Sequence, residues 1–414
     1  MKRILLLTFL SLAGLPAFAI EMPNPIVPDT GDTHAPRRTL GRVFQKLKAG
    51  EDVGIAYFGG SITAAPGWRV KTLNWFKDTF PKATVREINA AIGGTGSDLG
   101  VFRCGAEVIA QRPDLVFVEF SINDGSPTND FRKATMEGIV RQLWSSPTKP
   151  EIVFVYTTSR DLNCKRVSHP AVAKHYNIPD IDLQPPLVAA LNRPDLPKPT
   201  AEQLKNPKLN WKAPGQVFIS DSVHPNEMGH TIYTDTILAY LKTQVNAKPS
   251  PPPTLPPPLV SDEFATGRLV PPAKAKLAGN WEVLPHDEKN ALLKRYADGT
   301  INARKAGDAL EFEFEGTTIG LFQNVQKDGG KYDWTIDDGK DEPADKNYGG
   351  PKGSKHGKAD TAPGPYFARN HYTLLACGLT PGKHTLKIKV LEEHDKTSTG
   401  NRLLIGYFMV AGAK

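Results

Sequence analysis

The sequence lacks the features that identify several common classes of protein. Only three cysteines occur in 414 residues, and none has the spacing of zinc ligands, so no metal is expected. No phosphate-binding loop or dinucleotide fingerprint is present, so no cofactor is expected either. The charged residues are scattered along the chain, and a net charge of +7 without a basic cluster gives no indication of nucleic-acid binding.

Long apolar runs are also missing, except for a short one near the N-terminus. Lys2 and Arg3 precede the apolar segment Ile4 to Leu15, and Ala17-Phe18-Ala19 follows it. This order is typical of an export signal over residues 1–19, so we expect cleavage after Ala19 and a periplasmic or secreted protein. The apolar segment is too short to span a bilayer comfortably and no other run is long enough, so no membrane span is expected.

In an oxidising compartment the few cysteines allow one disulfide. Cys104 and Cys164 fall in the same half of the chain and are the candidate pair, whereas Cys377 falls in the other half. Buried free thiols are the alternative.

Proline divides the chain into two parts. Residues 247–258 read AKPSPPPTLPPP, and prolines at this density exclude regular ladders and favour an extended, stiff backbone. We therefore expect a linker there, a first domain over residues 20–246 and a second domain over residues 259–414.

The first domain alternates short apolar segments with helical patterns. The expected strands are Val53–Phe58, Thr84–Ala90, Leu115–Phe120 and Ile152–Tyr156. Their β-branched and aromatic composition is typical of parallel strands that are covered on both faces, and the alternation predicts an α/β, doubly wound parallel sheet. In such sheets the chemistry lies at the carboxyl ends of the strands. Residues 160–218 are rich in proline and lysine with little regular pattern, and form either a wall of a substrate cleft or plain surface.

The second domain changes to a period of two with turn residues, as in Ala309–Phe314, which predicts an all-β sandwich. Tethered to an exported protein, such a domain resembles a carbohydrate-associated module in architecture alone. Its aromatic residues are candidates for sugar stacking, although strand aromatics are usually core: Trp281, Tyr332, Trp334, Tyr348, Tyr366 and Tyr372.

Four short blocks in the first domain carry residues that are able to take part in catalysis. Each block follows a predicted strand or precedes the last predicted helix. They are Gly59-Gly60-Ser61, Asn89 to Gly94, Ser121 to Asp124, and Asp221 to Asn226.

Chemistry assigns roles to these blocks. Glycines before Ser61 permit a sharp turn that exposes its hydroxyl, which is a weak nucleophile until a base removes its proton. His224 is the natural base, and Asp221, three residues earlier, is placed to orient the imidazole. The N–H groups of Ser61 and Gly94 with the side-chain amide of Asn123 are the candidate donors of an oxyanion hole.

These blocks resemble the SGNH (GDSL-like) hydrolase family of secreted or periplasmic esterases over residues of about 50 to 245. The resemblance implies a flavodoxin-like sheet, a Ser61 nucleophile, an oxyanion hole that includes Gly94 and Asn123, and His224 with Asp221 as base and orienting acid. Two positions depart from the family pattern: Gly60 stands where the family has Asp, and Ser121 stands where it usually has Gly.

Each candidate also has an ordinary structural interpretation. Ser61 as a helix cap, and Asn123 and Asp221 as turn residues, are the alternatives to catalysis. The oxyanion donor near Gly94 is alternatively Gly93 or Gly96, and His230 competes with His224 although it falls within the last helix. Trp68 either lines a sugar or acyl subsite or packs in the core.

The sequence thus favours an exported serine esterase that removes acetyl or other small acyl groups from a polysaccharide through an acyl-enzyme. One alternative is an esterase of lipids or long-chain acyl esters on the same fold. Another is a non-catalytic glycan-binding protein. The sequence gives no indication of the oligomeric state.

Overall fold

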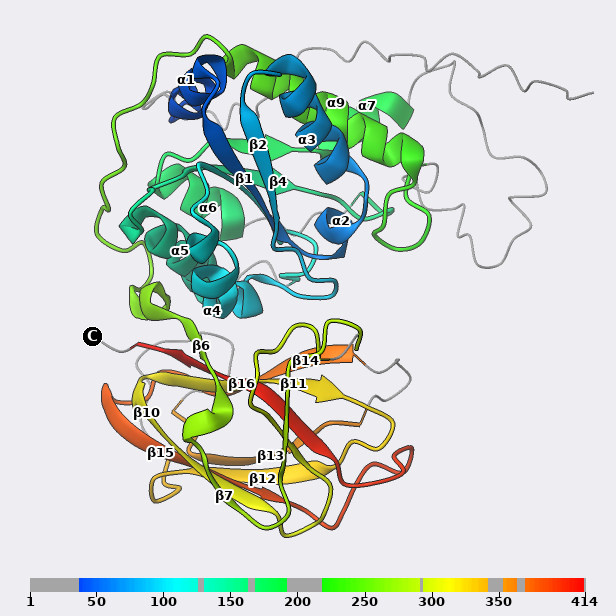
Figure 1. The fold of residues 1–414 in the computed structure, drawn as a ribbon, viewed down its shortest axis with the longest axis vertical. Helices are drawn as coiled ribbons and strands as arrows, with labels where there is room; N and C mark the ends of the chain where they lie inside the picture. The colour runs from blue at the N-terminus through cyan, green and yellow to red at the C-terminus, as the bar shows by residue number, and fades with distance from the viewer. Residues whose placement is uncertain are drawn as a thin grey trace, which may run out of the picture.

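The computed structural model describes residues 37–125, 130–162, 168–191, 218–290, 293–341, 353–362 and 369–412. The expected export signal and Cys164 lie outside these ranges. Figure 1 shows two bodies, an α/β domain followed by a β domain. Within the described ranges, none of the helices has the length and apolar character that a membrane crossing requires.

A five-stranded parallel sheet forms the centre of the first domain. Its strands are β1 (Asp52–Gly59), β2 (Thr84–Asn89), β3 (Leu115–Glu119), β4 (Glu151–Tyr156) and β5 (Asp180–Asp182), in the order β2-β1-β3-β4-β5. All four pairings are parallel, which is the flavodoxin-like order. The predicted fold class is confirmed, and the four predicted strands are present.

Helices cover both faces of this sheet. One face packs against α1 (Gly41–Ala49), α3 (Trp68–Thr79), α7 (Gln184–Leu191) and α9 (Glu227–Gln244), and the other against α4 (Ser97–Glu107), α5 (Asp130–Ser145) and α6 (Ser168–His175). Alternate residues of β1 divide between the two apolar clusters: Ile55 and Tyr57 face one and Ala56 and Phe58 the other. This division explains why the strands are apolar at every position.

The stretch from 160 to 218 is more regular than its composition suggests. It contains α6, β5 and α7, so the prediction of little regular structure was wrong for its described part. Pro170 and Pro185 lie in the first turns of α6 and α7, where a missing N–H removes no helical hydrogen bond. Proline there marks the beginning of a helix.

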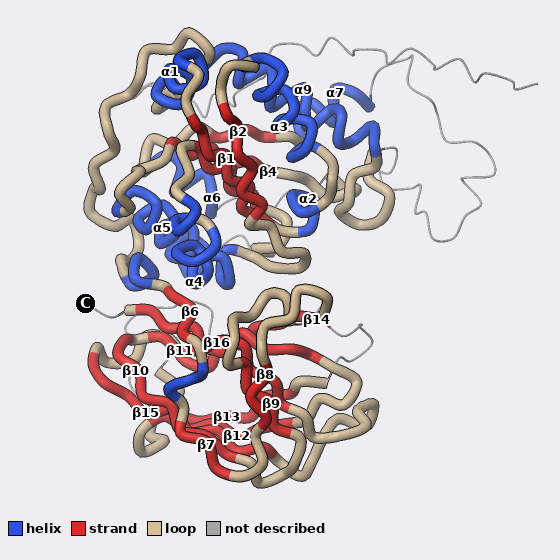
Figure 2. Tube along the Cα trace, in the orientation of Figure 1, coloured by secondary structure: helices blue, strands red, loops and turns tan. Residues whose placement is uncertain are grey.

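The second domain is an antiparallel sandwich of two sheets. One has the order β13-β12-β15-β10-β7 and the other β14-β11-β16-β9-β8, with β6 also paired to β16. Figure 2 shows the change from mixed helix and strand to a strand-rich body. The bounds of the strands are β6 (Arg268–Val270), β7 (Lys276–Ala278), β8 (Glu282–Leu284), β9 (Thr300–Ala303), β10 (Ala309–Gly316), β11 (Thr318–Val325), β12 (Lys331–Ile336), β13 (His356–Asp360), β14 (Arg369–Ala376), β15 (Gly382–Val390) and β16 (Leu403–Ala411).

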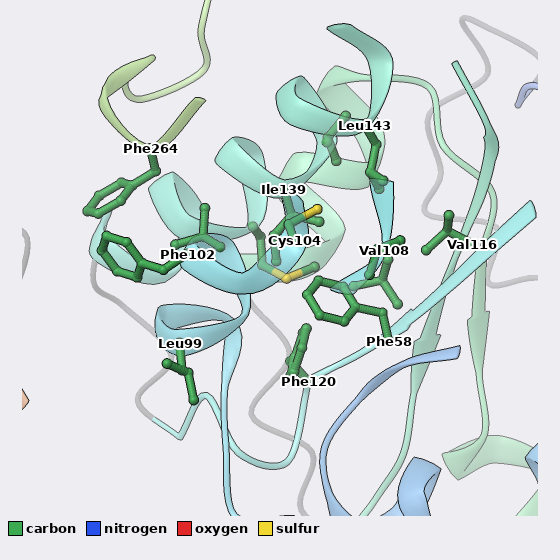
Figure 3. Packing of buried hydrophobic residues seen from close by; sticks show 14 of the residues in the cluster. Phe58, Leu99, Phe102, Cys104, Val108, Val116, Phe120, Ile139, Leu143 and Phe264 are labelled. Atoms are coloured by element: carbon green, nitrogen blue, oxygen red, sulfur yellow. The ribbon is translucent and has the colours of Figure 1, made fainter. Parts of the chain in front are cut away.

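One of the apolar clusters spans both domains. The cluster on the α4 and α5 face of the first domain continues into Phe322, Leu404 and Met409 of the sandwich. Phe264, in the short 3-10 helix Glu263–Thr266, packs edge-on to Phe102 at 5.9 Å between ring centroids. Figure 3 labels both rings in this cluster. A continuous apolar contact of this kind opposes independent movement of the two domains.

The proline-rich segment is attached to the first domain along its length. The hydroxyl of Thr39 donates to the carbonyl oxygen of Lys248 at 2.6 Å, and the guanidinium of Arg141 donates to that of Pro256 at 2.9 Å. At its end, the buried carboxylate of Glu137 accepts the N–H groups of residues 259, 260 and 261 at 2.5, 2.9 and 3.0 Å. The segment has neither helix nor strand, but these bonds fix its path.

Replacing Glu137 by Ala should destabilise the protein by roughly 3 kcal/mol, because three backbone N–H groups would lose a charged acceptor. Thermal and urea unfolding measure this change. The exposed Glu392 provides a matched control, and Glu392→Ala should stay within about 0.5 kcal/mol of wild type. Equal stability of both variants would show that the attachment of the segment contributes nothing.

Candidate functional site

Ser61 begins the short helix α2 (Ser61–Ala64) directly after β1. The turn between them is tightly enclosed, because a Cβ atom at Gly59 would lie 2.6 Å from the carbonyl oxygen of Glu119. A Cβ atom at Gly60 would lie 2.2 Å from Oδ1 of Asn123. A larger residue at position 60 would therefore require the side chain of Asn123 to shift.

Three side chains from two distant parts of the chain form a hydrogen-bonded row. His224 Nε2 lies 2.7 Å from Ser61 Oγ, and His224 Nδ1 lies 2.7 Å from Asp221 Oδ2. The segment that carries Asp221 and His224 is fixed beyond them by Asn226, which caps α9 by accepting the N–H of Gly229 at 3.0 Å. A hydroxyl, an imidazole and a carboxylate in this order can activate the hydroxyl as a nucleophile.

Asp221 is held as a carboxylate. Its partial burial works against the charge, but the N–H groups of His224 and Val223 and the imidazole of His224 all donate to it. Together they lower the pKa of Asp221 below its usual range. The side chains of Asp221 and His224 are 56% and 46% exposed, so the row lies at the surface of the domain.

Some of the candidate oxyanion donors lie next to Ser61. The N–H of Ser61 is in the first turn of α2, where no preceding helical carbonyl can accept it. A Cβ atom at Gly93 would lie 3.5 Å from Cβ of Ser61, and Gly94 has a φ of +73° with open space beside it. Gly96, by contrast, is enclosed, since a Cβ atom there would lie 2.3 Å from Asp124 Oδ1. Gly93 therefore lies beside Ser61, whereas Gly96 lies against Asp124.

A buried polar cluster lies under this loop, and sequence reasoning missed it. Asp124, next to Asn123, accepts the N–H and the hydroxyl of Ser97, both at 2.7 Å. His169 Nε2 lies 2.7 Å from Asp124 Oδ2, and both side chains are almost fully buried. Burial opposes the charge of Asp124, but the hydrogen bond and charge of His169, with the charge of Arg132, lower its pKa. No local pattern marks His169, because it falls in the stretch whose composition suggests irregular chain.

Glu119 is a second missed residue, although an acidic residue within an apolar strand was a usable signal. Its carboxyl accepts the hydroxyl of Thr63 in α2 at 2.8 Å and that of Thr157 at 2.9 Å. It therefore joins the helix that begins at Ser61 to the end of β4. Burial raises the pKa of Glu119 to about 7 against the effect of the two hydroxyls.

Two other candidates prove to be structural. Trp68 is fully buried and packs against Tyr57 and Phe117 at 5.5 and 5.9 Å between ring centroids, so core packing describes it and a subsite role was wrong. His230 accepts the N–H of Trp68 at 3.2 Å and so caps α3, and its pKa is lowered by burial. Cys104 is a buried free thiol. Among the described residues, no group of His, Cys, Asp and Glu side chains is arranged to hold a metal ion.

Comparisons with known proteins give one family match and several similar solved structures. Residues 57–232 match the model of the GDSL-like lipase/acylhydrolase family, so this part of the chain is similar to a family of ester-hydrolysing enzymes. A search of curated protein sequences finds no match.

Two solved structures share the two-domain architecture. The first is a two-domain esterase active on acetylated mannans, crystallised with mannopentaose; it is 23% identical, with a TM-score of 0.73 over 91% of this chain and 96% of that one. The second is described as a two-domain esterase active on acetylated mannans, at 22% identity and a TM-score of 0.71 over 91% and 95%.

The raised pKa of Glu119 predicts a dependence of stability on pH. A carboxyl whose pKa is higher in the folded than in the unfolded chain contributes to the free energy of unfolding. The contribution is fully present below the pKa of the unfolded chain, and it is lost as the pH rises through the pKa of the folded chain. Between pH 4.5 and 8, the free energy of unfolding of the wild-type protein should therefore fall by about 3 kcal/mol relative to that of Glu119→Gln, whose side chain does not titrate. Urea unfolding of both proteins across this range measures the difference, and parallel stability curves would contradict it.

Proposed function

We propose that the protein is an exported serine esterase that removes acetyl groups, or other small acyl groups, from a polysaccharide. The observation that carries this proposal is the row from Ser61 through His224 to Asp221 at 2.7 Å per step. The family match to residues 57–232 supports ester hydrolysis. The likeness of both domains to an esterase that acts on acetylated mannans supports a polysaccharide substrate.

In the proposed mechanism, Ser61 Oγ attacks the acyl carbonyl carbon while His224 Nε2 takes the hydroxyl proton. Asp221 fixes the imidazole by its other nitrogen and stabilises the cation that forms. The negative charge on the carbonyl oxygen is received by N–H groups at Ser61 and Gly94 and by the amide of Asn123. His224 then protonates the departing sugar hydroxyl.

The acyl group remains on Ser61 as an ester until water removes it. His224 takes a proton from the water, which attacks the acyl carbon, and returns that proton to Ser61 Oγ as the acid leaves. Each step uses the same donors for the developing charge. The surface position of the row, with His224 46% exposed, suits an acyl group on a large polymer and favours a polysaccharide over an enclosed long acyl chain.

Replacing Ser61 by Ala should lower kcat by about 10⁴-fold or more, because the attacking oxygen is lost. Released acetate is measured on a panel of acetylated mannan, xylan and other acetylated polysaccharides, and p-nitrophenyl acetate serves as a small reference ester. Ser145 is an exposed serine at the end of α5, and Ser145→Ala should keep the wild-type rate.

Three results separate the alternatives. Acetate release by Ser61→Ala at the wild-type rate would contradict the proposed nucleophile. A wild-type protein that prefers long acyl chains and ignores every acetylated polysaccharide would favour a lipid esterase, and tight glycan binding without turnover would favour a binding protein.

A further inference from the structure

The sandwich domain reaches the buried polar cluster under the candidate site. Tyr372, on β14, donates its hydroxyl to Asp98 Oδ1 at 2.6 Å. Asp98 is in the first turn of α4 and is 9% exposed. Burial and the charge of Asp98 raise the pKa of Tyr372 well above its ordinary value, so the hydroxyl keeps its proton and remains the donor.

From Asp98 the contacts continue through Arg132 to Asp124, which adjoins Asn123. Arg132, on α5, lies 2.5 Å from Asp98 Oδ2 and 3.6 Å from Asp124 Oδ1. Asp124 adjoins Asn123 in the chain, and the N–H groups of both residues donate to the carbonyl of Phe120 at 3.0 Å. A displaced Asp124 carboxylate would therefore shift the loop that carries the amide of Asn123.

Close packing makes this connection stiff. A Cβ atom at Gly96 would lie 2.3 Å from Asp124 Oδ1 and 2.9 Å from Asp98 Oδ1. Ser97, the next residue, donates both its N–H and its hydroxyl to Asp124. The two carboxylates are thus packed directly against the turn that follows Gly94, and neither can move without displacing this turn or Arg132.

The sandwich has a second contact with the same region. Arg295, beyond the proline-rich segment, donates to the carbonyl oxygen of Ala91 at 3.4 Å. Ala91 precedes Gly93 and Gly94 in the second block. The second domain therefore contacts the loop that carries Gly94 through Arg295, and it reaches the loop that carries Asn123 through Asp98, Arg132 and Asp124.

We propose that Tyr372 is a positioning residue for ester hydrolysis: through Asp98, Arg132 and Asp124 it holds the loop that places the amide of Asn123 beside Ser61. This inference rests on the proposed function, in which Asn123 receives the charge of the transition state. The sandwich is then a structural part of the esterase site.

The test is Tyr372→Phe in the full-length protein, which removes one hydroxyl and keeps the ring. We expect kcat on p-nitrophenyl acetate to fall roughly tenfold while KM stays within about twofold, because the lost interaction acts on the transition state. Tyr332→Phe is the matched control. Its hydroxyl is also buried in the sandwich, bonded to Gln323 at 3.4 Å, but it has no contact with Asp98. This variant should keep the wild-type kcat.

A double-mutant cycle tests the route. Asn123→Ala alone should lower kcat by about 10²-fold. If Tyr372 acts through Asn123, adding Tyr372→Phe to Asn123→Ala should change kcat by less than about twofold. A full tenfold loss in that background would overturn the proposed route, as would a wild-type kcat for Tyr372→Phe alone.

Thermal unfolding distinguishes a positioning role of Tyr372 from a purely structural one. A fall in kcat in both tyrosine variants, in proportion to their loss of Tm, would assign Tyr372 a structural role and overturn the inference. The Ser61→Ala variant tests the proposed function separately. If Ser61→Ala keeps its activity, the proposed function fails whatever Tyr372 does. If Ser61→Ala is inactive and Tyr372→Phe is normal, only the positioning role fails.

Discussion

The candidate site depends on parallel strands whose carboxyl ends lie at a common edge of the sheet. Strands β1 and β3 are paired in parallel from Ile55 with Leu115 to Gly59 with Glu119, so the residues after both strands emerge together. Ser61 follows β1, Asn123 follows β3, and the segment before α9 brings His224 to the same edge. Residues 61 and 224 therefore meet at 2.7 Å without any local sequence relation between them.

Burial around this edge fixes the side chains that carry the chemistry. Glu119 and Asp124 are buried acidic residues, and each accepts hydrogen bonds from hydroxyl, imidazole or backbone donors. Unsatisfied buried acids would be costly, so these contacts restrict the neighbouring loops to one arrangement. The apolar core that joins the sandwich to α4 and α5 extends the same restriction to the second domain.

Sequence reasoning recovered what depends on local patterns. Continuous apolar segments marked four of the five strands, and the Asp221 to Asn226 block marked its own loop because a spacing of three residues suits an Asp–His contact. It failed where tertiary packing determines the position or the role of a residue. Trp68 is in the core, because the ring fits between Tyr57 and Phe117, and α6 and α7 begin with prolines that suggested irregular chain. His169 and Tyr372 meet the Asp98–Arg132–Asp124 cluster through contacts between residues far apart in the chain, which one sequence does not reveal.

The most direct measurement of the central claim is covalent labelling of the wild-type protein with a fluorophosphonate, followed by peptide mass spectrometry. Such a reagent reacts with a serine only where a base activates the hydroxyl and donors receive the negative charge. We expect one stoichiometric label, on Ser61, with parallel loss of esterase activity and protection by an acetylated polysaccharide. A label on another residue, or an active enzyme that takes up no label, would contradict the assignment of Ser61, His224 and Asp221 as the catalytic row.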